Sequence, residues 1–308
     1  MEYAWGRLFL HTALAALVGT GCARRREADR RPAYGPAPPA RIQEYVVAVH
    51  PLHNPQRLFA VYGPILDRLN AENPGFRLRL EASRNYAAFE RKLAARAVHF
   101  ALPNPYQTVS SEAYGYRIFG KMGDDPQFRG IILVRRDSGI RNLRDLAGKR
   151  ISYPAPTALA ATLMPQFFLH ARGLDVDRDT QSVYVGTQES VILNVYYRVT
   201  DAGATWPIPW RSFQQGHPDQ AAELVVQWQT GTLPNNGLVV RDDVPLPVVR
   251  RVERLLFSLH LDAEGRRILE RIPLSRFERA SSRTYDPVRR FMKRFEAEVR
   301  PLPQEGRS

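Results

Sequence analysis

Residues 130–151, GIILVRRDSGIRNLRDLAGKRI, contain two short segments that are predicted to form β-strands. The first, residues 130–135, is an almost uninterrupted apolar run, which is typical of a strand buried on both faces of a sheet. The second is expected at residues 149–153. This stretch therefore predicts two strands of a covered sheet.

On both sides of this stretch, segments of strand length alternate with segments of helical period. Apolar residues of 58–69, for example, recur at helical spacing over three turns. The alternation argues for the α/β class, with parallel sheets covered by helices on both faces. Strands are expected at 45–49, 77–82, 97–102, 130–135, 149–153, 181–185, 200–204, 223–228 and 236–241. Helices are expected at about 58–69, 86–97, 157–172, 188–199 and 207–215, with two further apolar stripes at 248–259 and 285–295.

The composition is that of a folded globular chain, and its charge is strongly basic. The 308 residues are 44% hydrophobic, and the length suits two domains or one large one. The net charge is +13, carried almost entirely by arginine. A basic surface can bind nucleic acid or anionic lipid. However, the arginines are spread along the chain without an RNA motif, zinc finger or basic zipper, so nucleic-acid binding is not expected.

The N-terminus is predicted to be an export signal. Arg7 precedes a mostly apolar run at residues 8–18 that is too short to span a membrane, and small residues follow it. Cys22, the single cysteine, stands where a lipoprotein signal has its lipid-bearing residue, although Gly19 replaces the usual leucine. Residues 1–22 are thus predicted to be a lipoprotein-like signal peptide with lipidation at Cys22. A simple signal with an incidental cysteine is the alternative. Residues 23–43, rich in Arg, Pro and Ala, are predicted to be a flexible linker.

Polar, uncharged residues dominate the loops that follow the expected strands. Parallel α/β sheets bind ligands beyond the carboxyl ends of their strands, where helices begin. Tyr, Asn, Thr and Gln side chains suit a small oxyanion or polar metabolite, although the same residues also serve as caps and turns. The loops are Pro51–Pro55, Ser83–Tyr86, Pro103–Tyr106, Pro154–Leu159, Gly186–Glu189 and Thr205–Trp210.

Seven stretches together resemble the phosphate/phosphite/phosphonate-type periplasmic substrate-binding proteins of bacterial ABC transporters. Their order and spacing carry the resemblance, which covers roughly residues 44–295. The stretches are Pro51–Pro55, His99–Tyr106, Gly130–Ile151, Gly186–Ser190, Thr200–Ala204, Pro234–Arg241 and Tyr285–Val288.

The resemblance implies an α/β, two-lobed periplasmic-binding-protein (type II) fold with a cleft and a two-strand hinge. Lobe one would comprise residues 44–132 and 229–300, lobe two residues 133–228, and residues 301–308 a tail. The chain would cross between the lobes near Val134 and near Leu233–Asn236, and the lobes would close on the ligand by hinge rotation.

The resemblance also implies a function. The chain would be a periplasmic or cell-envelope solute-binding protein of an ABC importer, a monomer that captures a small polar or anionic, phosphonate- or phosphate-like solute. Its partners would be a small-molecule ligand and the ABC permease and ATPase. A membrane-tethered sensing domain for a signalling receptor is the open alternative.

An enzyme on the same two-lobed fold is the less favoured alternative. The sequence holds no Gly-x-Ser-x-Gly elbow, no His-Glu-x-x-His metal pattern and no phosphate-binding glycine motif. We therefore expect no catalytic residue, no metal ligand and no cofactor.

By position, the resemblance places the ligand contacts in the loops described above. Thr157 begins the lobe-two helix that would face an anion, in a Thr-Ala-Leu-Ala stretch where relatives often have a Ser-Thr-Ser-Gly-like run. Gln188 replaces a frequent histidine. Asp201 matches a family aspartate that is either a contact or buried structure, and Trp206 either walls the ligand or packs lobe two. The predicted ligand-binding residues are Tyr86, Asn104, Tyr106, Thr157, Gln188, Asp201 and Trp206.

Overall fold

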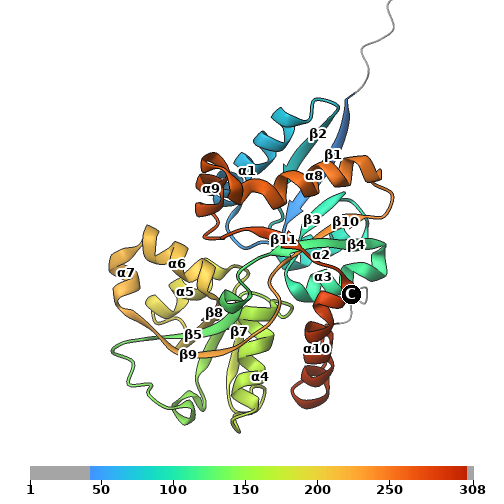
Figure 1. The fold of residues 1–308 in the computed structure, drawn as a ribbon. Helices are drawn as coiled ribbons and strands as arrows, with labels where there is room; N and C mark the ends of the chain where they lie inside the picture. Colours follow the sequence, from blue (N-terminus) through green and yellow to red (C-terminus); the bar gives the residue numbers. More distant parts are fainter. Residues whose placement is uncertain (1–41, 304–308) are drawn as a thin grey trace, which may run out of the picture. The chain divides into compact units, whose positions relative to one another are not determined.

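The computed structural model describes residues 42–303 (Figure 1). The predicted signal peptide, Cys22, nearly all of the predicted linker and the end of the predicted tail lie outside the described residues. Within residues 42–303, no helix combines the length and the apolar character needed to cross a membrane.

The first of two sheets has six strands in the order β11-β4-β10-β3-β1-β2. Strand β1 runs parallel to its neighbours β2 and β3, whereas β10 is antiparallel to β3 and β4, and β11 is antiparallel to β4. The strands are β1 (Gln43–Val49), β2 (Phe76–Glu81), β3 (Phe100–Leu102), β4 (Tyr116–Met122), β10 (Gly237–Arg241) and β11 (Phe277–Arg279).

The second sheet has five strands in the order β7-β6-β8-β5-β9. Strand β6 is parallel to β7 and β8, and β5 is antiparallel to β8 and β9. The strands are β5 (Arg129–Arg135), β6 (Arg150–Tyr153), β7 (Gln181–Tyr184), β8 (Ala202–Thr205) and β9 (Leu224–Thr232).

Ten α-helices lie between and after these strands within residues 42–303. The first shows why they form: Asn54 caps it by accepting a hydrogen bond from Arg57 N at 3.0 Å, and Pro55 occupies its first turn. The helices are α1 (Pro55–Glu72), α2 (Tyr86–Ala94), α3 (Pro105–Ser111), α4 (Met164–His170), α5 (Gln188–Tyr196), α6 (Pro207–Gly216), α7 (Pro218–Ala222), α8 (Leu246–Ser258), α9 (Ala263–Glu270) and α10 (Asp286–Glu298).

Each sheet has an apolar core on both faces. On the first sheet, α1 and α8 pack in one cluster and α2 packs on the other face. On the second, residues of α4 belong to one cluster, and residues of α5, α6 and α7 belong to another. Figure 1 shows α1, α8 and α9 beside the first sheet and α4 to α7 beside the second. Burial of strands on both faces explains their continuous apolar runs.

The expectation of parallel sheets is wrong in part, because both sheets are mixed. The antiparallel strands β5 and β10 are the ones that enter their sheet directly from the other sheet. The expected strands also omit β4 and β11, and the expected helices omit α3, α7 and α9.

The chain passes between the sheets at residues 123–128 and 233–236, which we call the crossing segments. They lie side by side: Leu233 N donates to Phe128 O at 3.2 Å, and Asn235 Nδ2 donates to Gly123 O at 2.7 Å. Because β5 belongs to the second sheet from its start, the first crossing precedes Arg129 and does not lie near Val134. The residue limits of the two lobes remain a prediction.

Candidate ligand-binding site

A small cavity lies where the ends of the two sheets meet. It has a volume of about 10 Å³, which is room for roughly one water molecule. Parallel strands of both sheets direct their carboxyl ends to it, and four helices begin beside it. The lining residues are His50, Tyr86, Asn104, Phe128, Ala158, Leu159, Ala160, Ala161, Gln188, Trp206 and Asn236.

The cavity brings together four of the seven residues predicted to bind ligand. Tyr86 and Gln188 are the first residues of α2 and α5, and Asn104 and Trp206 directly precede α3 and α6. All four are almost fully buried. Their contact with a ligand remains a prediction.

The other three do not line the cavity. The Tyr106 hydroxyl donates to Pro303 O at 3.3 Å, and the Thr157 hydroxyl donates to Glu90 Oε1 at 2.5 Å. Asp201 lies at the amino end of β8, where its half-exposed carboxylate accepts a hydrogen bond from Arg150 N at 2.9 Å. Asp201 therefore ties two strands together at the opposite end of the strand from the cavity.

Sequence reasoning missed three polar or aromatic lining residues: His50, Phe128 and Asn236. His50 directly follows β1 and could have been found by the rule that ligands bind beyond strand ends. Phe128 and Asn236 directly precede β5 and β10, which run antiparallel to their neighbours. The amino ends of β5 and β10 therefore lie at the same edge of their sheets as the carboxyl ends of the parallel strands.

A chain of hydrogen bonds fixes the polar wall of the cavity. Thr205 Oγ1 donates to Gln188 Oε1 at 2.8 Å, and Gln188 Nε2 donates to the Tyr86 hydroxyl at 3.1 Å. Burial raises the pKa of Tyr86 well above its usual range, so this hydroxyl keeps its proton. Since the Tyr86 oxygen already accepts from Gln188, its proton is available to a ligand.

His50 is a neutral acceptor. Its Nδ1 lies 3.0 Å from Leu102 O, and a carbonyl oxygen only accepts, so Nδ1 carries the proton. Burial lowers the pKa of His50 to about 4, against the weaker opposing effect of that hydrogen bond. At neutral pH, Nε2 therefore presents a lone pair.

This burial predicts an acid-sensitive fold. The pKa of His50 is about 4 in the folded chain and about 6.5 when unfolded. As the pH falls, His50 of the unfolded state therefore takes up a proton at a higher pH than His50 of the folded state. The stability of the fold should decrease as the pH drops below about 6.5. Between about pH 7.5 and about pH 5, the loss due to His50 should be about 2 kcal/mol. Urea unfolding of wild type and His50→Asn at both pH values measures it; an equal loss in the two proteins would contradict this assignment.

A family model described as the periplasmic substrate-binding protein of phosphonate ABC transporters matches residues 47–285. The chain belongs to this family.

Two curated relatives agree with the family assignment. A probable ABC-transporter phosphite-binding protein from Prochlorococcus marinus is 20% identical over 53% of this chain, and the phosphonates-binding periplasmic protein of Escherichia coli is 21% identical over the same share. The matched parts span 60% and 50% of these relatives' own lengths.

Solved structures show the same fold. A phosphonate-transporter binding protein from Pseudomonas aeruginosa superposes with a TM-score of 0.77 and 16% identity, covering 83% of this chain and 87% of that one. A Prochlorococcus marinus protein in complex with methylphosphonate superposes with a TM-score of 0.75 and 16% identity, covering 82% of this chain and 98% of that one. At such identities the likeness concerns the fold alone. The predicted α/β, two-lobed periplasmic-binding-protein fold is confirmed.

In this phosphonate-binding-family protein, an apolar helix start forms one wall of the cavity. A wide helical turn at Leu159–Leu163 leads into α4, and Ala158 O accepts from Thr162 N at 2.8 Å. The first N–H groups of such a segment have no acceptor within the helix and are available to a ligand. Gly130 allows the close packing here, because a Cβ at this position would lie 2.5 Å from Ala160 O.

No charged side chain is among the lining residues of this cavity. Behind the wall, the Glu90 carboxylate accepts hydrogen bonds from Thr157 Oγ1 at 2.5 Å and from Gln107 Nε2 at 2.8 Å. Burial of a doubly charged solute requires compensating charge or many hydrogen bonds. The arrangement therefore suits a solute of low charge, held by hydrogen bonds and packed against Phe128, Leu159 and Trp206.

Proposed function

We propose that this protein is the solute-binding component of an ABC importer and captures a small oxyacid between its two lobes. The observation that carries the proposal is the cavity, whose uncharged donors and acceptors come from both sheets. The names of the relatives support phosphite or a phosphonate as the solute class, and one structural neighbour binds methylphosphonate.

Hydrogen bonds across the cavity connect residues of the two proposed lobes. Gln188 Nε2 donates to the Tyr86 hydroxyl at 3.1 Å, and Asn104 Nδ2 donates to Thr157 O at 3.2 Å. In a neighbouring pocket, which Gln188 also lines, Arg57 Nη2 donates to Ser212 Oγ at 2.6 Å. These bonds hold the two proposed lobes together.

Entry of a solute then requires the lobes to separate. The cavity holds about one water molecule, so an oxyacid must displace part of the cross-lobe bonding. The two crossing segments, at 123–128 and 233–236, are the place where a hinge rotation would be absorbed. Occupied and empty proteins would differ in shape, which is what a permease and its ATPase could recognise.

Family membership favours a periplasmic location. Export by the N-terminal segment, lipidation of Cys22 and partnership with a permease and ATPase belong to the proposal. The relatives are binding proteins of transporters, which favours binding without turnover.

Thermal unfolding with a ligand panel tests the proposal. The panel contains phosphite, methylphosphonate, phosphate, methanesulfonate and acetate at neutral pH. A ligand present at one hundred times its Kd stabilises the folded state by about 2.7 kcal/mol, so phosphite or methylphosphonate should raise the Tm by roughly 5 °C. Acetate is the control for ionic strength. A Tm that none of the other four compounds raises above its value in acetate would overturn the proposal.

A further inference from the structure

Asn236 lines the cavity and has a buried side-chain oxygen. Its side chain is fully buried, and within residues 42–303 its Oδ1 has no hydrogen-bond partner. Its Nδ2 donates to Met122 Sδ at 3.5 Å. A thioether sulfur only accepts, so this contact fixes the orientation of the amide and leaves Oδ1 for the cavity.

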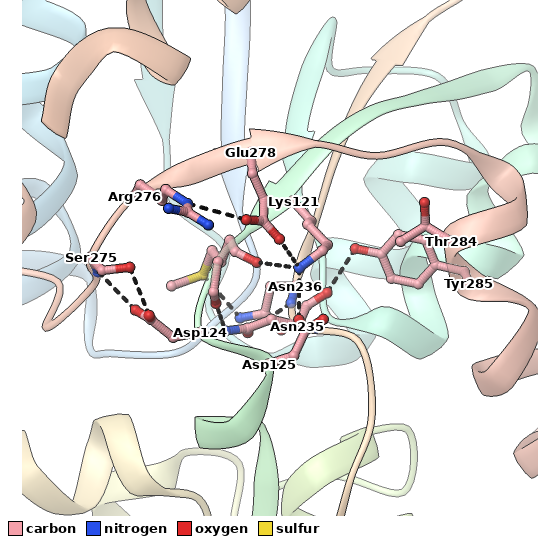
Figure 2. A network of polar contacts seen from close by, with 12 residues as sticks. Lys121, Asp124, Asp125, Asn235, Asn236, Ser275, Arg276, Glu278, Thr284 and Tyr285 are labelled. Atoms are coloured by element: carbon pink, nitrogen blue, oxygen red, sulfur yellow. Dashed lines mark hydrogen bonds and ion pairs between the residues drawn. The ribbon is translucent and has the colours of Figure 1, made fainter. Parts of the chain in front are cut away.

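The position of Asn236 is fixed by its neighbours in the second crossing segment. Asn236 N donates to Asn235 Oδ1 at 2.8 Å, and Asn236 O accepts from Met122 N at 2.8 Å. Two hydrogen bonds hold Asn235 in turn. Asn235 N donates to Asp125 Oδ1 at 2.9 Å, and the Tyr285 hydroxyl donates to Asn235 O at 2.7 Å. Figure 2 shows Asn235 and Asn236 together at the centre of this network.

Burial of this oxygen costs free energy, because its hydrogen bonds to water are lost. The cost remains until a hydrogen-bond donor reaches the oxygen. Water or a solute in the cavity can supply that donor. His50 Nε2 is a second acceptor in the lining, whereas the Tyr86 hydroxyl and the first N–H groups of the 159–163 segment are donors. The cavity therefore has both kinds of group and no charge.

We propose that Asn236 Oδ1 accepts a hydrogen bond from the acidic hydroxyl of the bound solute, so that the site takes a singly protonated oxyacid in preference to a fully ionised oxyanion. The inference rests on the proposed function and names its substrate class. A singly protonated phosphonate offers one hydroxyl to an acceptor and its other oxygens to donors. A sulfonate of the same size has oxygens only, and its lone pairs would face those of Asn236, which disfavours it.

Calorimetric titration of the full chain with methylphosphonate and methanesulfonate at neutral pH tests this selectivity. Wild type should bind methylphosphonate at least about tenfold more tightly, the effect of one good hydrogen bond to a charged group. Asn236→Leu removes the acceptor at similar volume. It should weaken methylphosphonate binding about tenfold and strengthen methanesulfonate binding, because the facing lone pairs are removed. The Tm should stay at or above that of wild type.

Tyr62→Phe is the matched control. Tyr62 is also buried and its hydroxyl has no partner within residues 42–303, but it lies in the core of the first sheet and not in this cavity. Both affinities should stay at wild-type values. If Asn236→Leu binds methylphosphonate as tightly as wild type, the inference is wrong while the proposed function stands. If wild type binds neither compound nor phosphite, the proposed function fails and the inference fails with it.

The pH profile of wild type is a second measurement that needs no variant. Neither titratable lining residue, His50 or Tyr86, changes charge between about pH 6 and about pH 9. The charged groups packed behind the lining are Glu90 behind Thr157, and Lys121, Asp125 and Glu278 around Asn235. Methylphosphonate affinity should fall as its second proton is lost, while methanesulfonate affinity stays level. A rise in methylphosphonate affinity with pH would overturn the inference.

Discussion

Replacing Lys121 with methionine should lower the free energy of unfolding by about 2 to 3 kcal/mol. The Lys121 side chain is only 5% exposed, and its Nζ lies 2.7 Å from Asp125 Oδ1 and 2.5 Å from Glu278 Oε1 (Figure 2). Loss of the cation leaves two carboxylates facing each other beside the crossing segments. Both carboxylates are partly exposed, so water compensates some of the loss, and the expected value lies below that of a fully buried pair.

Urea unfolding of Lys121→Met against Lys149→Met measures this effect. Lys149 is half-exposed, and its Nζ lies 3.8 Å from Asp201 Oδ1. Its replacement should therefore change the free energy of unfolding by less than about 0.5 kcal/mol. A Lys121→Met protein as stable as the Lys149 variant would show that the network contributes little to the fold.

Replacing Gln188 with glutamate should cost about 3 kcal/mol of stability at about pH 8 and abolish binding of oxyacids. Gln188 is 2% exposed, and its Nε2 donates to the Tyr86 hydroxyl. An ionised carboxylate there loses this donor and is buried without a cation. Burial would raise the pKa of the new carboxyl, so the folded state keeps its proton longer than the unfolded state. Stability should therefore fall as the pH rises and should largely recover by about pH 5.

Unfolding of Gln188→Glu at both pH values, beside Gln214→Glu as an exposed control, measures the effect. Titration with methylphosphonate should show at least about a hundredfold loss of affinity in Gln188→Glu alone. An equal destabilisation at the two pH values would argue that packing, and not buried charge, is responsible.

The pattern of apolar residues along the sequence predicted most elements of the fold, because a buried strand or helix face is formed by residues close together in the sequence. Strand β5, for example, coincides with the apolar run at 130–135 to within one residue. Strand β4 reads YRIFGKM, and its Gly120 and Lys121 interrupt the apolar pattern. Lys121 is buried there between two carboxylates, and one of them belongs to Glu278, 157 positions later. Such a long-range partner cannot be inferred from local sequence.

The residues of the candidate site could likewise be predicted where a local rule places them. Tyr86, Asn104, Gln188 and Trp206 meet because each stands at the start of a helix that follows a parallel strand. Asp201 precedes its strand, so the same rule would have placed it away from the site. Asn236 also precedes its strand, but β10 runs antiparallel, and that direction depends on the route of the chain between the sheets.

Calorimetric titration of methylphosphonate and phosphite into the wild-type protein tests the central claim most directly. It should be done at two temperatures, because a heat of binding that vanishes at one temperature reappears at another when apolar surface is buried. We expect saturable binding of at least one compound with one site per chain. Absence of any binding heat at both temperatures, in protein shown to be folded, would contradict the claim that the two lobes close around a small oxyacid.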